Sequence, residues 1–198
     1  PTPFPTSPRQ QACSLCGQRH FQVVGERDRH GAPLRTVICT TCGLISHEAI
    51  PAADELAKFY QQEYRQQYQG DSSPQAHRVV RAWHVGSKLV ERLRPFVHSG
   101  ERVFEVGAGF GCTVKQFELV GFPASGVEPH FRFREFGVRE LQADIAAGVL
   151  DDIPQQPCHD VIIVHHVLEH LAQPLQALER IRRMLRWGGR AYVEVPNV

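Results

Sequence analysis

The sequence predicts an α/β protein, in which helices cover a parallel sheet and a small cysteine-bearing module precedes it. Two observations carry this prediction. Beyond residue 100, short apolar runs alternate with segments of helical periodicity as far as the end of the 198-residue chain. Before that point, the first quarter of the chain holds two C-x-x-C-G sequences, which are typical of a metal-binding module.

Composition gives no indication of a nucleic-acid or membrane partner. Lys and Arg number 22 and Asp and Glu number 21, so the chain lacks the basic field that dominates nonspecific binding to nucleic acid. No run approaches the roughly eighteen apolar residues that a membrane-spanning helix needs. The Pro-rich start shows no signal-peptide pattern. We therefore expect a cytoplasmic protein, with nucleic acid an unlikely partner and no membrane partner.

The first fifty residues predict a flexible lead over 1–11 and a zinc ribbon over 12–50. Two thiolates separated by two residues can bind one ion from a tight turn, and two such turns joined by a hairpin close a tetrahedron. The four expected ligands are Cys13, Cys16, Cys39 and Cys42. Four thiolates leave no open coordination position for chemistry, so the predicted Zn²⁺ is structural.

Residues 51–98 are expected to be a helical connector or lid. Leu56, Phe59, Tyr60, Tyr64 and Tyr68 recur at roughly helical intervals, and an apolar face predicts a second helix over 75–94. One interpretation is an amphipathic connector that packs on the next domain. The other is a lid that contributes to a substrate pocket.

The remaining elements alternate between strand and helix. Strands are predicted at 103–106, 124–127, 141–144, 161–164 and 190–195, and helices at 113–120, 132–140 and 174–185. Such alternation favours a parallel sheet with helices on both faces and a ligand at the carboxyl ends of the strands. We expect this domain to span 99–198.

The loop after the first of these strands is the strongest functional signal. Glu105 stands within an apolar strand, and glycines follow at positions 107, 109 and 111. Glycine accepts positive φ and lets a ligand lie against the backbone. The spacing departs from the G-x-G-x-x-G of dinucleotide sites, and the Glu105 carboxylate would repel a pyrophosphate but could pair with an ammonium group. The pattern thus favours an aminoacyl nucleoside, with a ligand-free tight turn as the alternative.

This run resembles the first motif of class I S-adenosylmethionine-dependent methyltransferases. Further matches follow in the family's order at Val127-Glu128-Pro129, Ala143-Asp144-Ile145, Asp160 to His170, and Leu185 to Pro196. The resemblance implies a Rossmann-like methyltransferase sheet that binds S-adenosylmethionine, with Glu128 on the ribose hydroxyls and Asp144 and Ile145 at the adenine. The expected cofactor contacts are Glu105, Gly107, Ala108, Gly109, Gly111, Glu128, Pro129, Asp144, Ile145 and His165.

Candidates for chemistry follow the fourth predicted strand. On a helix, His166, Glu169 and His170 would occupy positions i, i+3 and i+4 and share one face. This spacing is similar to the E-x-x-E-H set of ubiquinone-type O-methyltransferases, which is associated there with a divalent metal, although His166 replaces the first acid. For Glu169 and His170 we expect a packing role, with metal binding or catalysis as the alternative. His165 is expected to line the cofactor pocket, and His166 is the candidate general base.

Ribbon, Tyr-rich connector and methyltransferase core together resemble the C-methyltransferases that act on nucleotide-linked sugars. This resemblance implies a small-molecule or glycan acceptor. Two alternatives remain: an RNA or protein methyltransferase that uses the ribbon to hold a macromolecule, and a noncatalytic donor-binding scaffold. The family's sheet carries two more strands after the fifth, so we expect a truncated sheet whose edge a partner or a missing C-terminal segment covers.

Overall fold

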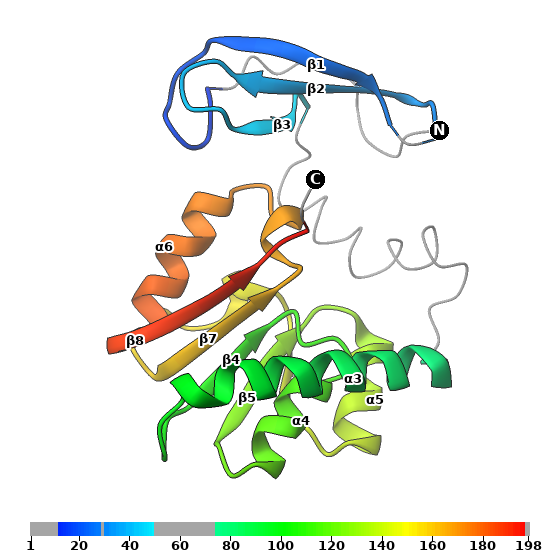
Figure 1. The fold of residues 1–198 in the computed structure, drawn as a ribbon, viewed down its shortest axis with the longest axis vertical. Helices are drawn as coiled ribbons and strands as arrows, with labels where there is room; N and C mark the ends of the chain where they lie inside the picture. The colour runs from blue at the N-terminus through cyan, green and yellow to red at the C-terminus, as the bar shows by residue number, and fades with distance from the viewer. Residues whose placement is uncertain (1–11, 29, 50–73, 197–198) are drawn as a thin grey trace. The chain divides into compact units, whose positions relative to one another are not determined.

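Residues 12–28, 30–49 and 74–196 are described by the computed structural model (Figure 1). They divide into two compact units, one built on a three-stranded sheet and the other on a five-stranded sheet. Among these residues, no helix is long and apolar enough to cross a membrane. The expected lead over 1–11 and the aromatic helical stretch over 52–68 lie outside the described residues.

The small sheet is antiparallel and has little apolar core. Its strands β1 (Phe21–Arg27), β2 (Pro33–Cys39) and β3 (Ile45–His47) lie in the order β1-β2-β3. Nearly every residue of β1 is exposed, whereas Cys13, Val37 and Cys39 are buried. A sheet of this size buries little apolar surface, and two of its few buried residues are cysteines.

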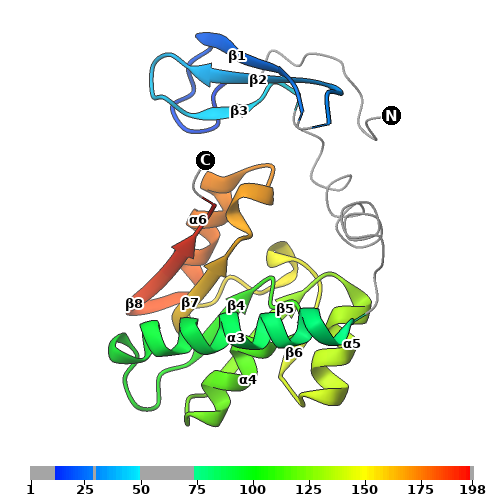
Figure 2. The same ribbon diagram turned by 45° about the vertical axis from the view of Figure 1, so that its right-hand side comes forward.

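The large sheet is parallel throughout. Its strands are β4 (Val103–Val106), β5 (Ala124–Glu128), β6 (Ile145–Ala147), β7 (His159–His165) and β8 (Leu185–Glu194). They lie in the order β6-β5-β4-β7-β8, as Figure 2 shows. The chain moves outward from β4 through β6 and then returns to the other side of β4 with β7. Ligands of open α/β sheets bind at such a switch point, just beyond the carboxyl ends of the strands.

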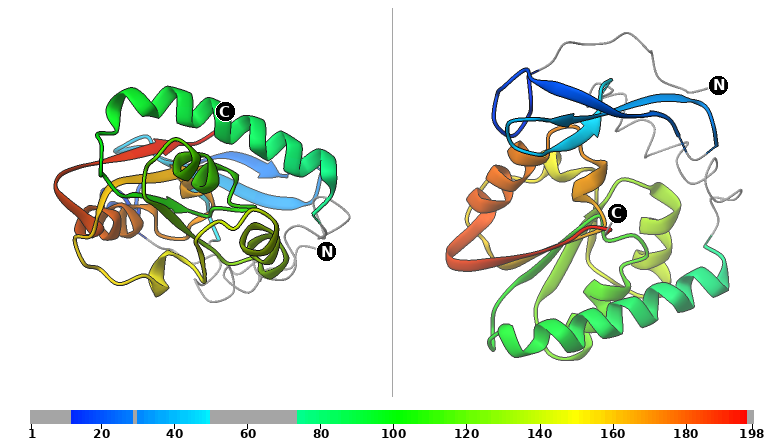
Figure 3. Two further views of the ribbon diagram at one scale, coloured as in Figure 1. Left: turned by 90° about the horizontal axis from the view of Figure 1, so that it is seen from below. Right: turned by 45° about the horizontal axis from the view of Figure 1, so that its top comes forward.

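Helices cover both faces of this sheet. On one face lie α3 (Ala76–Leu93), α4 (Cys112–Leu119) and α5 (Phe131–Glu140), which the left view of Figure 3 shows side by side. On the other lies α6 (Pro174–Met184) (Figure 1). Short 3₁₀ turns η1 (Arg94–Phe96), η2 (Leu150–Asp152) and η3 (Leu168–His170) complete the fold.

Alternation of side chains along the strands builds two separate cores. In β4, Val103 packs with the α3 and α4 side, while Phe104 and Val106 pack with α6. Leu89 and Leu93 of α3 belong to the first of these clusters. Apolar packing therefore groups α3, the second half of the expected connector, with the five-stranded sheet.

The predicted α/β sheet is confirmed, with two local corrections. The strand expected at 141–144 instead occupies Ile145–Ala147. Residues 141–144 form the turn that ends α5, in which Gln142 has φ 53° and the Ala143 N–H donates to the Gly137 carbonyl at 3.0 Å. The last strand begins at Leu185 rather than at residue 190, since its pairing with β7 continues on both sides of an irregularity.

Candidate functional site

Three glycines shape the loop that follows β4. Gly107, Gly109 and Gly111 all have positive φ, at 71°, 56° and 73°. A Cβ at Gly107 would lie 2.6 Å from Val167 Cγ2, and one at Gly111 would lie 2.4 Å from Ile145 Cδ1. A Cβ at Gly109 would meet nothing within 4 Å. Two of the glycines therefore serve packing within the protein, and the middle one borders open space in which a ligand could approach the backbone.

Glu105 is buried beside this loop with an unsatisfied oxygen. It is 6% exposed, and among the described residues no group hydrogen-bonds to its Oε2. Burial raises the pKa of its carboxyl group to about 8, against hydrogen bonds from Thr113 and from the Val114 N–H at the start of α4. A ligand ammonium group would supply the missing partner and favour the ionised form. The residue thus fits the aminoacyl end of S-adenosylmethionine.

Glu128, the last residue of β5, holds the glycine loop. Its Oε2 accepts the Gly109 N–H at 2.8 Å, and its Oε1 accepts the His130 N–H at 2.9 Å. A carboxylate has about four acceptor positions, so oxygens engaged in this way can still accept ribose hydroxyls. Pro129 follows directly, and His130 is the N-cap of α5. Glu128, the residue predicted to bind the ribose, therefore lies at the carboxyl edge of the sheet, next to the glycine loop.

Asp144 and Ile145 do not lie where the adenine assignment expects them. Asp144 precedes β6, is exposed, and its carbonyl accepts the Gly126 N–H at 2.9 Å, within the length of β5 rather than at its carboxyl end. Ile145 is buried against Gly111. The carboxyl end of β6 is Ala147, opposite Glu128, and η2 follows it.

A cluster of histidines and acids lies at the carboxyl end of β7. His165 ends the strand, and His166 has a φ of 54°, so the expected helix over 166–170 is wrong: only Leu168–His170 forms a single 3₁₀ turn. Glu169 nevertheless contacts both neighbouring histidines, with its Oε1 3.7 Å from His166 Nδ1 and 3.6 Å from His170 Nε2. The predicted trio is brought together by a turn.

Glu194 completes this cluster from β8, and sequence reasoning missed it. Its Oε1 lies 3.6 Å from His165 Nε2 and 3.9 Å from His166 Nε2. Its Oε2 accepts hydrogen bonds from the Tyr192 hydroxyl and, at 3.1 Å, from Arg92 Nη1 of α3. The hydrogen bond from Tyr192 holds the pKa of the Glu194 carboxyl group below its usual value, and burial lowers the pKa of His165. A carboxylate facing a neutral imidazole is thus the favoured state.

The glycine loop and this cluster are adjacent. Val106 pairs with Val164 in the parallel register of β4 and β7, so Gly107 and His165 follow at the same edge of the sheet. Val167, packed against Gly107, joins the two. The arrangement places the glycine loop beside imidazole and carboxylate groups that can exchange protons.

The four predicted ligand cysteines come together in the small sheet. Their Sγ atoms all lie within 4.8 Å of one another, with Cys13 to Cys42 at 3.5 Å and Cys16 to Cys39 at 3.6 Å. Thiolates about 2.3 Å from a shared zinc ion stand roughly 3.8 Å apart. Burial alone would raise the pKa of Cys39, but the Cys42 and Thr41 N–H groups and the adjacent thiols lower it to about 6. The cluster thus fits Zn²⁺.

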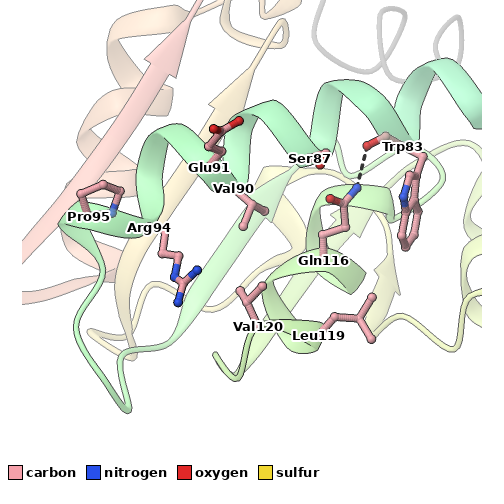
Figure 4. Close-up of a pocket in the computed structure, with 9 residues that line it drawn as sticks. All are labelled: Trp83, Ser87, Val90, Glu91, Arg94, Pro95, Gln116, Leu119 and Val120. Carbon is pink, nitrogen blue, oxygen red and sulfur yellow. Dashed lines mark hydrogen bonds between the residues drawn. The ribbon is translucent and has the colours of Figure 1, made fainter.

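A groove of about 660 Å³ between α3 and α4 lies apart from this edge (Figure 4). It is lined at one side by Trp83 and at the other by Leu119, and Gln116 Nε2 donates across it to the Trp83 carbonyl at 2.6 Å. Because α4 begins at the glycine loop and ends at Leu119, the groove is at the opposite end of that helix. We do not assign the groove to the site.

Sheet order, glycine loop and switch-point location define a nucleotide-binding α/β protein. A family model described as a methyltransferase domain matches residues 74–198. The chain therefore belongs to this methyltransferase-domain family. No curated protein matches it.

Solved structures share the fold. An S-adenosylmethionine-dependent methyltransferase from Archaeoglobus fulgidus is 18% identical with a TM-score of 0.52, over 68% of this chain and 57% of that one. A complex of the Haloferax volcanii Trm112 methyltransferase activator with a methyltransferase gives 20% identity and a TM-score of 0.53, over 73% and 62%. The chain thus spans less than two thirds of these relatives, and at such identities the likeness concerns the fold.

Proposed function

We propose that this enzyme transfers a methyl group from S-adenosylmethionine to a small polar molecule or a glycan, with a nucleotide-linked sugar as one candidate. The observation that carries the proposal is the junction of the glycine loop with the His165–His166–Glu194 cluster at the switch point of the sheet. The loop suits the donor, and the cluster suits an acceptor that must lose a proton.

The donor half divides among three elements. Glu105 would pair with the ammonium group, Gly109 and Ala108 would border the donor through their backbone, and Glu128 with Pro129 would hold the ribose. We assign adenine binding to the carboxyl end of β6 and to η2 instead of to Asp144. Ala147, the last residue of β6, pairs with Glu128 at the edge of the sheet, and η2 follows it in the chain. Arg180 supports that turn: its Nε donates to the Leu150 carbonyl at 2.8 Å and its Nη2 to the Asp151 carbonyl at 2.6 Å.

The acceptor half is the polar cluster. Bound S-adenosylmethionine supplies an electrophilic methyl group, so the chain's own task is to align the acceptor and take up its proton. His166 is the proposed general base, because its ring is partly exposed and lies between the Glu169 and Glu194 carboxylates. These acids would stabilise the imidazolium that forms.

The small sheet is proposed to bind one structural Zn²⁺ through Cys13, Cys16, Cys39 and Cys42. Observed sulfur separations of 3.5 and 3.6 Å support this proposal. All four are free thiols in the structure and are arranged around a common centre.

Calorimetry with S-adenosylhomocysteine tests the donor half, and transfer of a labelled methyl group to a panel of acceptors tests the other. The panel holds nucleotide-linked sugars, small hydroxyl compounds, RNA and protein. We expect binding, and transfer to a member of the first two classes. Absence of binding at millimolar ligand would refute the donor site. Transfer only to RNA or protein would replace the acceptor class, and binding without any transfer would favour the scaffold alternative.

A further inference from the structure

We propose that His165, His166 and Glu194 form a second metal site, which takes a divalent transition-metal ion. Each residue offers one ligand atom, and these atoms all lie within 4.8 Å of one another. Ligand atoms about 2.1 Å from a common ion stand roughly 3.0 to 3.4 Å apart. The Glu194 Oε1 lies 3.6 Å and 3.9 Å from the two imidazole nitrogens, so small side-chain rotations would bring the three atoms to that spacing.

The backbone at His166 creates this arrangement. Consecutive residues of a regular strand point to opposite faces of the sheet. The φ of 54° at His166 turns the chain at the end of β7, and the two imidazole rings then lie 4.3 Å apart between centroids. The His166 N–H donates to the Glu194 carbonyl at 2.9 Å, which fixes the turn against β8. The left-handed region is strained for any residue other than glycine, and such strain concentrates at functional sites.

The Glu194 carboxylate is oriented for one-sided ligation. Its Oε2 is held by Arg92, at 3.1 Å, and by the Tyr192 hydroxyl. Its Oε1 is thereby directed to the histidines. Hydrogen bonds to the outer oxygen of a ligand carboxylate are a common support of metal centres.

His166 has a corresponding support. Its Nδ1 faces Glu169 Oε1 at 3.7 Å, while its Nε2 faces the centre of the site. A carboxylate behind a histidine fixes the tautomer in which the opposite nitrogen can bind a metal. Glu169 therefore supports His166 from behind and is not itself a ligand. The third ligand is Glu194 of β8, so this site differs from one built on His166, Glu169 and His170.

The ligand set indicates the class of ion. Two imidazoles and one carboxylate suit first-row transition ions such as Zn²⁺, Fe²⁺ or Co²⁺ better than Mg²⁺ or Ca²⁺. Three protein ligands leave coordination positions open, and the three side chains are 19%, 45% and 34% exposed. The role of the ion rests on the proposed function: it would bind the oxygen of the methyl acceptor and lower the pKa of that hydroxyl group. In the metal-loaded enzyme, the lowered pKa of the acceptor would replace the general-base role of a free His166.

Titration of Co²⁺ into the zinc-loaded chain tests the site without any acceptor. Calorimetry gives the stoichiometry, and visible absorption separates the two sites, because only cobalt in the cysteine cluster gives sulfur-to-cobalt bands. We expect one additional equivalent of Co²⁺ without those bands. His165→Ala, Glu194→Gln and His166→Gly should each weaken binding at least tenfold. The glycine at position 166 keeps the left-handed backbone.

Matched variants supply the controls. His170→Asn, outside the three ligands, and the exposed His98→Ala should bind Co²⁺ as the unmodified chain does. Tyr192→Phe should weaken binding less than Glu194→Gln does, because it removes only a support. Binding of S-adenosylhomocysteine and circular dichroism report on the fold and donor half separately. Absence of extra cobalt, or cobalt that survives His165→Ala and Glu194→Gln in folded protein, would overturn the site.

Discussion

Glu128 accepts the Gly109 N–H at 2.8 Å, so the end of β5 fixes the middle of the loop that follows β4. The two residues are 19 positions apart in the chain and meet because their strands are parallel neighbours. The same carboxylate accepts the His130 N–H at the start of α5. One acid therefore orders the loop before any ligand arrives and presents its remaining acceptor positions at the edge of the sheet.

Replacing Glu128 should weaken donor binding strongly. In Glu128→Ala the loop loses its anchor and the ribose its acceptor, and hydrogen bonds to a charged group contribute about 1.5–3 kcal/mol each. We expect the affinity for S-adenosylhomocysteine, measured by calorimetry, to fall at least tenfold. Glu140→Ala, at the exposed end of α5, is the matched control and should bind normally. Equal affinities in the two variants would remove Glu128 from the site.

The loop glycines should separate stability from binding. Gly111→Ala places a Cβ 2.4 Å from Ile145 Cδ1 at a φ of 73°, so unfolding free energy should fall by about 2–4 kcal/mol. Gly109→Ala meets no neighbour and should cost only the backbone term of about 1–2 kcal/mol. Denaturant titration measures both. A folded Gly109→Ala that keeps full affinity for S-adenosylhomocysteine would contradict the close approach of ligand to this loop.

The parts of the fold set by neighbouring residues could be predicted from the sequence. The strand at Val103–Val106 and the glycine pattern after it depend on local apolarity and backbone freedom. The third strand could not be placed, because the turn at Gln142 consumes residues whose composition alone does not reveal a helix end. The predicted site residues differ in the same way: Glu128 and Asp144 each match a motif of the family, but only Glu128 lies at the carboxyl end of its strand, since Asp144 precedes β6.

The cluster of histidines and acids at the carboxyl ends of β7 and β8 was only partly predictable from the sequence. His165, His166 and Glu169 are close in the chain and could be named, although a helix was the wrong reason for grouping them. Glu194 lies one residue before the end of the strand predicted at 190–195, and the rule that carboxyl ends of parallel strands meet could have found it. Arg92 had no such signal, since only the packed fold brings it within 3.1 Å of a residue 102 positions away.

Removing zinc should unfold the small sheet alone. Its strands bury few apolar side chains, so ligation of the proposed zinc ion would supply most of the free energy that keeps this unit folded. Metal analysis should give one equivalent at the cysteines, and a chelator should raise amide exchange across 12–49 while 74–196 stays protected. Cys39→Ser should reproduce the chelated state, with Cys158→Ser as the control. Protection of 12–49 that survives complete zinc removal would rule out a structural metal.

Stability should fall as pH rises from about 4.5 towards 8, because of Glu105. Burial raises its folded pKa to about 8 from an ordinary value of 4.5, so between these limits the folded state binds more protons than the unfolded state. The slope of unfolding free energy with pH is then negative in this window and flattens above it. Glu105→Gln, which stays neutral, should lack this contribution. The difference between the two proteins, measured by denaturant titration across pH 5 to 9, should grow to a few kcal/mol, about 1.4 kcal/mol per pKa unit.

S-adenosylhomocysteine should reverse part of this loss of stability above pH 7, because its ammonium group pairs with the ionised Glu105 carboxylate. A pH-independent difference between the two proteins would show that Glu105 is ionised throughout.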